Sequence, residues 1–277
     1  MSEYQYYEFQ TVGRRLSDTE MHELRAYSTR ARITPTSFVN EYSFGSFKGN
    51  PDAWVEKYFD AFLYVANWGT HELKLGLPVK LLSAETARLY CCGDAASVRE
   101  KAGRLVLTFR SEQEGGGDWV QAEGILSALV PLRAELAGGD LRGLYLGWLL
   151  NAQAGDLDKG MREPPVPANL GSLSSTLSDL VDFLRIDPEL LAAAVQGSPR
   201  VKSVPVSRKA MAAWVASLPS REKDDALVRL MEEQDSPIGM ELSARFSRHR
   251  AAENPAPERP RRTVAELLAA AGMEERE

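Results

Sequence analysis

The chain has 277 residues, of which 44% are hydrophobic and 26% are charged, a composition typical of a globular protein with a buried core. The formal net charge is −6, so the strongly basic surface of a typical nucleic-acid binder is not indicated. No stretch is an uninterrupted apolar run of roughly 18 residues, and the first ten residues lack the basic and apolar regions of a secretory signal. We therefore expect a cytoplasmic protein without a membrane partner.

Aromatic residues are concentrated at the start of the chain, where 16 of the 23 Phe, Trp and Tyr residues lie within the first 90 positions. Later residues are rich in Leu and Ala and follow a helical period. The contrast predicts an α+β fold in which an N-terminal, mostly antiparallel sheet with helices is followed by an irregular helical bundle. We expect an aromatic-rich α+β domain over 1–115, a helical domain over 116–250, a Pro- and Arg-rich linker over 251–262 and a C-terminal amphipathic helix over 263–277.

The N-terminal part alternates between predicted strands and helices. Residues 4–12 alternate as a strand does, and a helix follows in which Ser17 and Glu20 fit a capping box. Residues 33–47 predict the next strand. A helix is then expected to start after Asn50, which is a plausible N-cap.

Two strands, a short helix and one more strand complete this part. Residues 61–78 predict two strands around a glycine, the second with its leucines inward and with Glu72 and Lys74 outward. The short helix ends at Cys91 and Cys92, which are adjacent and are expected to be reduced, buried thiols. The last strand is predicted over 104–113.

Helical patterns dominate after the glycine run at 114–118, which is interpreted as a domain junction. Three apolar stripes, around Trp148, Leu180 and Trp214, predict core-facing helices. Residues 161–175 contain prolines and glycine and are expected to form a loop across the surface.

The end of the chain predicts a separate short helix, in which Thr263 and Glu266 fit a capping box. Its apolar side is the predicted partner-binding surface, because an amphipathic helix on a tether binds by laying that side into a groove. These residues are Val264, Leu267, Leu268 and Ala271. The alternative is that the same side packs on the helix's own domain.

Candidate ligand-binding residues lie in the strand over 33–47 and just after it. Asn40 is expected to share a face with Phe38, Tyr42 and Phe44, and a buried amide needs hydrogen-bond partners. Such an amide orients a ligand or ties the sheet edge to a loop. The candidate set is Asn40, Glu41, Tyr42 and Lys48.

Other chemistry is weakly indicated. The three histidines, His22, His71 and His249, are far apart in the sequence and lack metal-ligand spacing, so neither a metal site nor a cofactor is predicted. No phosphate-binding loop or nucleophile motif is present. The arginines of the region 245–262 form a possible basic patch, which is the one hint of nucleic acid.

The phrases "ITPTSFVNEY" and "YVANWGT" are distinctive. On these phrases the chain resembles a family of uncharacterised bacterial proteins, and the resemblance runs from Tyr4 to about Leu218. It implies no activity, because none is assigned to the family. The leading hypothesis is therefore a non-catalytic interaction protein that docks on another protein. An enzyme with a site in the N-terminal domain is the alternative, and a nucleic-acid accessory protein is the weaker one.

Overall fold

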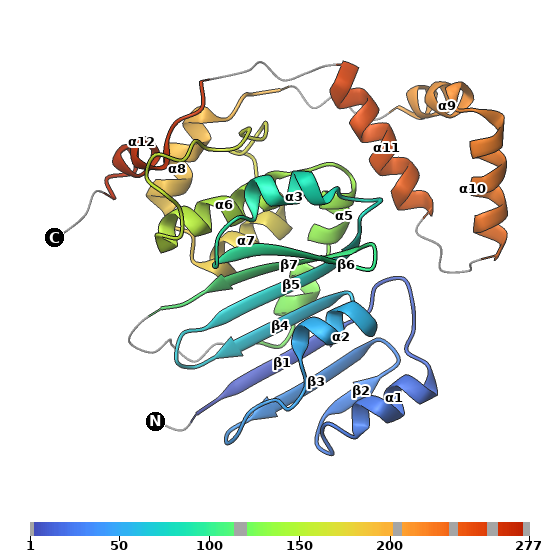
Figure 1. The fold of residues 1–277 in the computed structure, drawn as a ribbon, viewed down its shortest axis with the longest axis vertical. Coiled ribbons are helices and arrows are strands. Elements are labelled where there is room, and N and C mark those ends of the chain that lie inside the picture. Colours follow the sequence, from blue (N-terminus) through green and yellow to red (C-terminus); the bar gives the residue numbers. More distant parts are fainter. Residues whose placement is uncertain (1–2, 114–120, 202–206, 233–237, 254–259, 274–277) are drawn as a thin grey trace.

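The computed structural model describes residues 3–113, 121–201, 207–232, 238–253 and 260–273 (Figure 1). Its strands are β1 (Gln5–Gln10), β2 (Arg32–Thr34), β3 (Ser37–Tyr42), β4 (Ala61–Ala66), β5 (His71–Pro78), β6 (Ala96–Lys101) and β7 (Arg104–Ser111). Its helices are α1 (Asp18–Arg25), α2 (Pro51–Lys57), α3 (Ala84–Tyr90), α4 (Ile125–Leu129), α5 (Leu132–Ala137), α6 (Arg142–Ala154), α7 (Ser175–Leu184), α8 (Pro188–Gly197), α9 (Arg208–Ser217), α10 (Ser220–Glu232), α11 (Ile238–Glu253) and α12 (Val264–Ala270). The predicted α+β class is confirmed.

The strands form one antiparallel sheet in the order β2-β3-β1-β4-β5-β7-β6. The predicted strand over 33–47 is wrong in its extent, because Pro35 and Thr36 form a tight turn that divides it into β2 and β3. The sequence pattern does not predict β6. This strand lies at the edge of the sheet, and its Arg99, Glu100 and Lys101 give it the composition of a solvent-exposed segment.

Helix starts follow their local signals closely. The Ser17 hydroxyl accepts from the Glu20 amide at 3.2 Å while the Glu20 carboxylate accepts from the Ser17 amide at 2.8 Å, which confirms the capping box. Asn50 caps α2 as predicted, with Pro51 in its first turn. These bonds satisfy backbone donors that a helix leaves unpaired.

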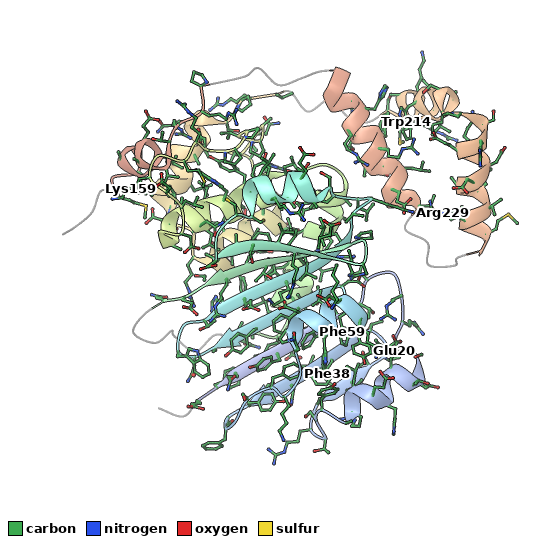
Figure 2. The ribbon with its side chains drawn as sticks, in the orientation of Figure 1. Glu20, Phe38, Phe59, Lys159, Trp214 and Arg229 are labelled. Carbon is green, nitrogen blue, oxygen red and sulfur yellow. The ribbon has the colours of Figure 1, made fainter. Side chains whose placement is uncertain are left out.

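One face of the sheet carries an aromatic cluster under α1 and α2 (Figure 1). Phe9 and Phe62 lie at its centre, with ring centroids 4.5 Å apart, and Trp54 of α2 packs over Phe9 at 4.9 Å. Figure 2 shows Phe38 and Phe59 in the same part of the molecule. Alternation along β1 and β3 sends Phe9 and Phe38 into this cluster and Val39 to the other face.

The opposite face is covered by α3, by helices between α4 and α8, and by α12, which share one hydrophobic cluster with it. The central helix α6 lies directly on β7, since a Cβ added at Gly147 would stand 2.5 Å from the ring of Phe109. This cluster includes residues on both sides of the predicted boundary at residue 115, and the domain limits stay predictions. The glycine junction at 114–118 lies outside the described residues.

The sheet face that carries the aromatic cluster becomes polar at β5. Lys74 of β5 is buried, with its Nζ 2.8 Å from Asp52 Oδ1 and 3.0 Å from Glu72 Oε1. Glu72 and Lys74 do lie opposite the leucines of β5, but the expectation of an exposed face is wrong. The two acids offset the cost of desolvating the ammonium group.

Candidate functional site

The predicted partner-binding side of α12 packs on the protein's own body. Val264, Leu267 and Ala271 are buried and Leu268 is partly buried, all in the cluster that covers the sheet. The helix lies against α8 and α6 (Figure 1). The capping box of Thr263 and Glu266 is present as predicted. The structure therefore has the alternative arrangement, in which α12 docks in cis.

A buried ion pair fastens the segment that leads into α12. The guanidinium of Arg262 binds both carboxylate oxygens of Glu163, through Nε at 3.0 Å and Nη2 at 3.1 Å. The Tyr145 hydroxyl donates to the same carboxylate at 2.9 Å, and burial first, then this carboxylate, raises the pKa of Tyr145 well above its ordinary value. Arg262 also donates to the Ala193 carbonyl at 2.7 Å. We call this group the C-terminal clamp.

Backbone bonds extend the clamp along the loop between α6 and α7. The Val264 amide donates to the Met161 carbonyl at 2.9 Å, and the Ala265 amide to the Lys159 carbonyl at 3.0 Å. Lys159 lies beside α12 (Figure 2). The loop predicted over 161–175 is confirmed up to the start of α7, and it supplies the buried acid of the clamp.

The arginines of the possible basic patch bind different partners in different parts of the protein. Arg262 belongs to the clamp, and Arg245 pairs with Glu222 at 2.5 Å. Arg248 donates to the carbonyls of Ala244 and Lys80, each at 3.4 Å. Arg245, Arg248 and Arg262 are therefore engaged at three different places, which weakens the argument for nucleic acid.

The four candidate ligand residues line one groove of about 440 Å³. One wall is the segment Ala26–Arg30 after α1, and the other is the segment that follows β3. The groove is lined by Ala26, Tyr27, Ser28, Thr29, Arg30, Asn40, Glu41, Tyr42, Ser43, Phe44, Ser46 and Lys48. It lies where β3 extends beyond its short partner β2, which pairs only with Ser37–Val39.

The first wall is held in place by two side chains. Arg25 donates from Nη1 to the carbonyls of Ser28, Thr29 and Ala31, at 3.3, 3.2 and 2.6 Å. Asn40 donates to the Ser28 hydroxyl at 2.9 Å, and its Oδ1 accepts from the Glu41 amide at 3.1 Å. Asn40 thus ties the sheet edge to a loop, which is one of the two roles considered for it.

The polar side chains of β3 point in two directions. Tyr42 lies on the face of the aromatic cluster, with its ring centroid 5.6 Å from that of Tyr7. Glu41 is on the opposite face, where burial and the Glu41 carboxylate raise the pKa of Tyr4. Asn40, Glu41 and Tyr42 therefore do not converge on one point as an acid–base pair does. Phe44 follows the strand, is 84% exposed, and does not share the buried face expected for it.

Sequence reasoning missed Arg30 and Tyr27, and it placed the helices of 207–253 in the helical domain rather than in a three-helix arm formed by α9, α10 and α11. Arg30 and Tyr27 lie in a segment without period or motif, so only the fold brings them to Lys48. The arm stands to one side of the sheet (Figure 1) and contacts the body through α11 on α5.

Helix α10 turns its charged side inward and its apolar side outward. Towards α11, Arg229 binds both oxygens of Glu241, at 3.0 and 3.1 Å, and Glu222 pairs with Arg245. Figure 2 shows Arg229 and Trp214 between the helices of the arm, where Trp214 packs on Phe246. Outward, four apolar side chains are between 51% and 85% exposed: Leu227, Val228, Leu230 and Met231. We call these four residues the α10 stripe.

The stripe of α9 is also more exposed than predicted. Met211 and Val215 are 42% and 41% exposed, although the pattern indicated a core-facing helix. The spacing of apolar residues predicts that a helix has an apolar side, but it does not predict which part of the protein covers that side.

Neither a metal-ligand cluster nor a membrane-spanning helix is found in the part of the chain that the structure describes. It contains no group of three or more His, Cys, Asp or Glu side chains placed to hold a metal ion. No helix among the described residues combines the length and hydropathy of a membrane span. Cys91 is buried, and burial raises its thiol pKa, whereas Cys92 is exposed, contrary to the prediction.

Comparisons with protein-family models, curated proteins and solved structures found no match to the chain. The resemblance to an uncharacterised bacterial family stays a prediction.

Proposed function

We propose that the protein is a non-catalytic, cytoplasmic accessory protein that docks on another protein through the α10 stripe. The observation that carries this proposal is the orientation of α10, whose ion-paired side faces its own chain while its apolar side faces solvent. Apolar area left in water is unfavourable, by about 25 cal/mol for each Å². A contiguous exposed patch of this kind marks an interaction surface.

The charges beside the stripe favour a basic amphipathic partner. An open hollow of about 440 Å³ next to Val228 is lined by Arg221, Glu222, Asp224 and Asp225. Glu222 is neutralised by Arg245, and Arg221 is outnumbered by the two aspartates. The occupant we propose is a helix of another protein with apolar residues flanked by Lys or Arg, since complementary charge guides and orients such contacts.

Affinity capture from the native cell lysate tests the proposal, with the full-length protein and the double variant Leu227→Asp/Met231→Asp as baits. The matched control is Leu89→Asp, because Leu89 is also an exposed leucine on a helix, 54% exposed on α3. We expect a partner that the wild type and the control capture and the double variant loses. Equal thermal unfolding of the three baits shows that the fold is intact.

Purified partner then tests the chemistry of the contact. Asp224→Lys/Asp225→Lys is expected to weaken binding at low salt and to reduce its salt dependence. Identical capture by all baits would reject the α10 stripe as the docking surface. Capture that is lost on deleting Lys and Arg residues of the partner would support the proposed occupant.

A further inference from the structure

We propose that the groove between the segment Ala26–Arg30 and the segment after β3 binds a mononucleotide. This site lies on the N-terminal part of the sheet and is independent of the docking proposed for α10. Two cations, a fixed wall, two exposed aromatic rings and the size of the groove support this ligand.

Two cationic side chains line the groove from different walls. Arg30 belongs to the segment after α1, and Lys48 belongs to the segment after β3. Within the described residues neither side chain forms an ion pair, whereas many other cations of this chain do. A doubly charged phosphate placed between the walls neutralises both, and a guanidinium and an ammonium are the usual protein donors to phosphate oxygens. A monocarboxylate would neutralise only one.

The wall that carries Arg30 is fixed before a ligand arrives. Three backbone carbonyls bind Arg25, and the Ser28 hydroxyl accepts from the amides of Arg30 and Ala31, at 3.3 and 3.2 Å. Asn40 of β3 donates to the same hydroxyl, and this bond ties the wall to the sheet. A site that is already ordered loses little conformational entropy on binding, so modest contacts suffice for measurable affinity.

The rim supplies aromatic surface of a kind that nucleobases use. Tyr27 is 43% exposed, with its ring centroid 5.2 Å from that of Trp54, and Phe44 is 84% exposed. Base–aromatic stacking contributes about 1–3 kcal/mol per base. The volume of about 440 Å³ lies within the range, roughly 300–1,000 Å³, of pockets for small ligands.

A longer nucleic acid fits these observations less well. Each further phosphate needs a further cation near the groove, and Arg30 and Lys48 are the only cationic residues that line it. The net charge of −6 also opposes the approach of a polyanion. The favoured ligand is therefore one nucleoside with one phosphate group.

Calorimetric titration of the full chain at low salt tests the inference, with AMP, GMP, CMP and UMP as separate probes. Inorganic phosphate and adenosine test the two halves of the ligand. Arg30→Gln and Lys48→Gln each remove one exposed cation of the groove, and Phe44→Ala removes one exposed ring. Arg15→Gln is the matched control, because it removes an exposed cation outside the groove.

We expect at least one nucleotide to bind saturably, more tightly than phosphate or adenosine. Arg30→Gln and Lys48→Gln should each raise its Kd about tenfold or more, while Arg15→Gln leaves it unchanged. Phe44→Ala should weaken the binding of the nucleotide without weakening the binding of inorganic phosphate. The inference is overturned by any of three results: no nucleotide saturates, Arg15→Gln has the effect of the groove variants, or ten-residue oligothymidylate binds more tightly than every mononucleotide.

Discussion

Nε of Arg262 lies 3.0 Å from Oε1 of Glu163, whose side chain is only 1% exposed. The two residues are 99 positions apart in the sequence, yet their backbones also exchange a bond, from the Glu163 amide to the Arg262 carbonyl at 2.8 Å. Through this contact residues 260–262, the described end of the predicted linker, are joined to the body, and the apolar side of α12 packs in the core.

Arg262→Met should release α12 and destabilise the protein by about 3–5 kcal/mol, because it leaves the carboxylate of Glu163 buried without its cation. Urea unfolding measures the loss, and limited proteolysis reports cleavage after residue 260. Arg261→Gln is the control, since that side chain is exposed and it is the Arg261 carbonyl that accepts from Arg162, at 2.9 Å. Equal stability of the two variants would contradict the role of the clamp.

His71 should make the stability fall below pH 6.5. Its Nδ1 lies 2.7 Å from the Phe183 carbonyl and its Nε2 lies 2.7 Å from Nη2 of Arg185, so the ring is held neutral with the proton on Nδ1. Burial lowers the pKa of His71 below its ordinary value of 6.5.

Below pH 6.5, His71 is protonated in the unfolded chain but stays neutral in the folded chain. The free energy of unfolding therefore falls as the pH is lowered, by at most ~1.4 kcal/mol per pH unit, until the pH reaches the pKa of His71 in the folded protein. Urea unfolding at pH 7.5 and 5.5 measures this. His71→Gln removes the titration, so its stability should change less between the two pH values than that of the wild type. A change of the same size in both proteins would show that other groups cause it.

Asn40→Ala should lower the free energy of unfolding by about 1–3 kcal/mol. It removes the buried Asn40 side chain, so the Ser28 hydroxyl and the Glu41 amide each lose their hydrogen bond to it. Chemical denaturation gives the loss. Hydrogen exchange should show faster exchange at Glu41, and Ser43→Ala, on the exposed segment after β3, serves as the control. Protection of the Glu41 amide that is unchanged in Asn40→Ala would contradict this assignment.

Gly147→Ala should destabilise the protein although alanine favours a helix by about 1 kcal/mol over glycine. The added Cβ would stand 2.5 Å from Cε1 of Phe109 and 3.2 Å from Cβ of Ala96, both in the core. Overpacking of this kind costs about 1–3 kcal/mol, which outweighs the helix propensity. Thermal unfolding measures the change. The control is Gly239→Ala, where an added Cβ meets nothing within 4 Å. Gly155→Ala would not serve, because Gly155 has a φ of +79°, which strains alanine. A higher midpoint for Gly147→Ala would reject the close packing of α6 on β7.

Much of the fold was predictable because its signals are local. The capping residues Ser17 and Thr263 bond to backbone amides three positions away, so a short stretch of sequence contains both partners. Alternation along β1 predicts which side chains share a face, because the period of a strand depends only on backbone geometry. β6 escaped prediction because the pairing that makes Val98 and Arg99 a strand comes from β7.

The sites depend on contacts that no local pattern contains. The residues Asn40, Glu41, Tyr42 and Lys48 do line one groove, but Arg30 comes from a segment with no periodicity. The apolar side of α12 was predicted from its pattern, but the pattern does not say what covers it, and in the structure this side packs on α8 and α6 of the same chain. α10 illustrates the converse, since its stripe has helical spacing and remains uncovered within the described residues.

The loop between α6 and α7 holds the chain on both sides of the three-helix arm. Asn169 of this loop exchanges two bonds with Val201, at 2.9 and 3.0 Å, shortly before α9, and Glu163 of the same loop holds Arg262 after α11. The chain is thus bonded to this loop before α9 and after α11, in addition to the contact of α11 with α5. Both ends of the arm are therefore joined to the loop that also holds the start of α12, where the Val264 amide donates to the Met161 carbonyl.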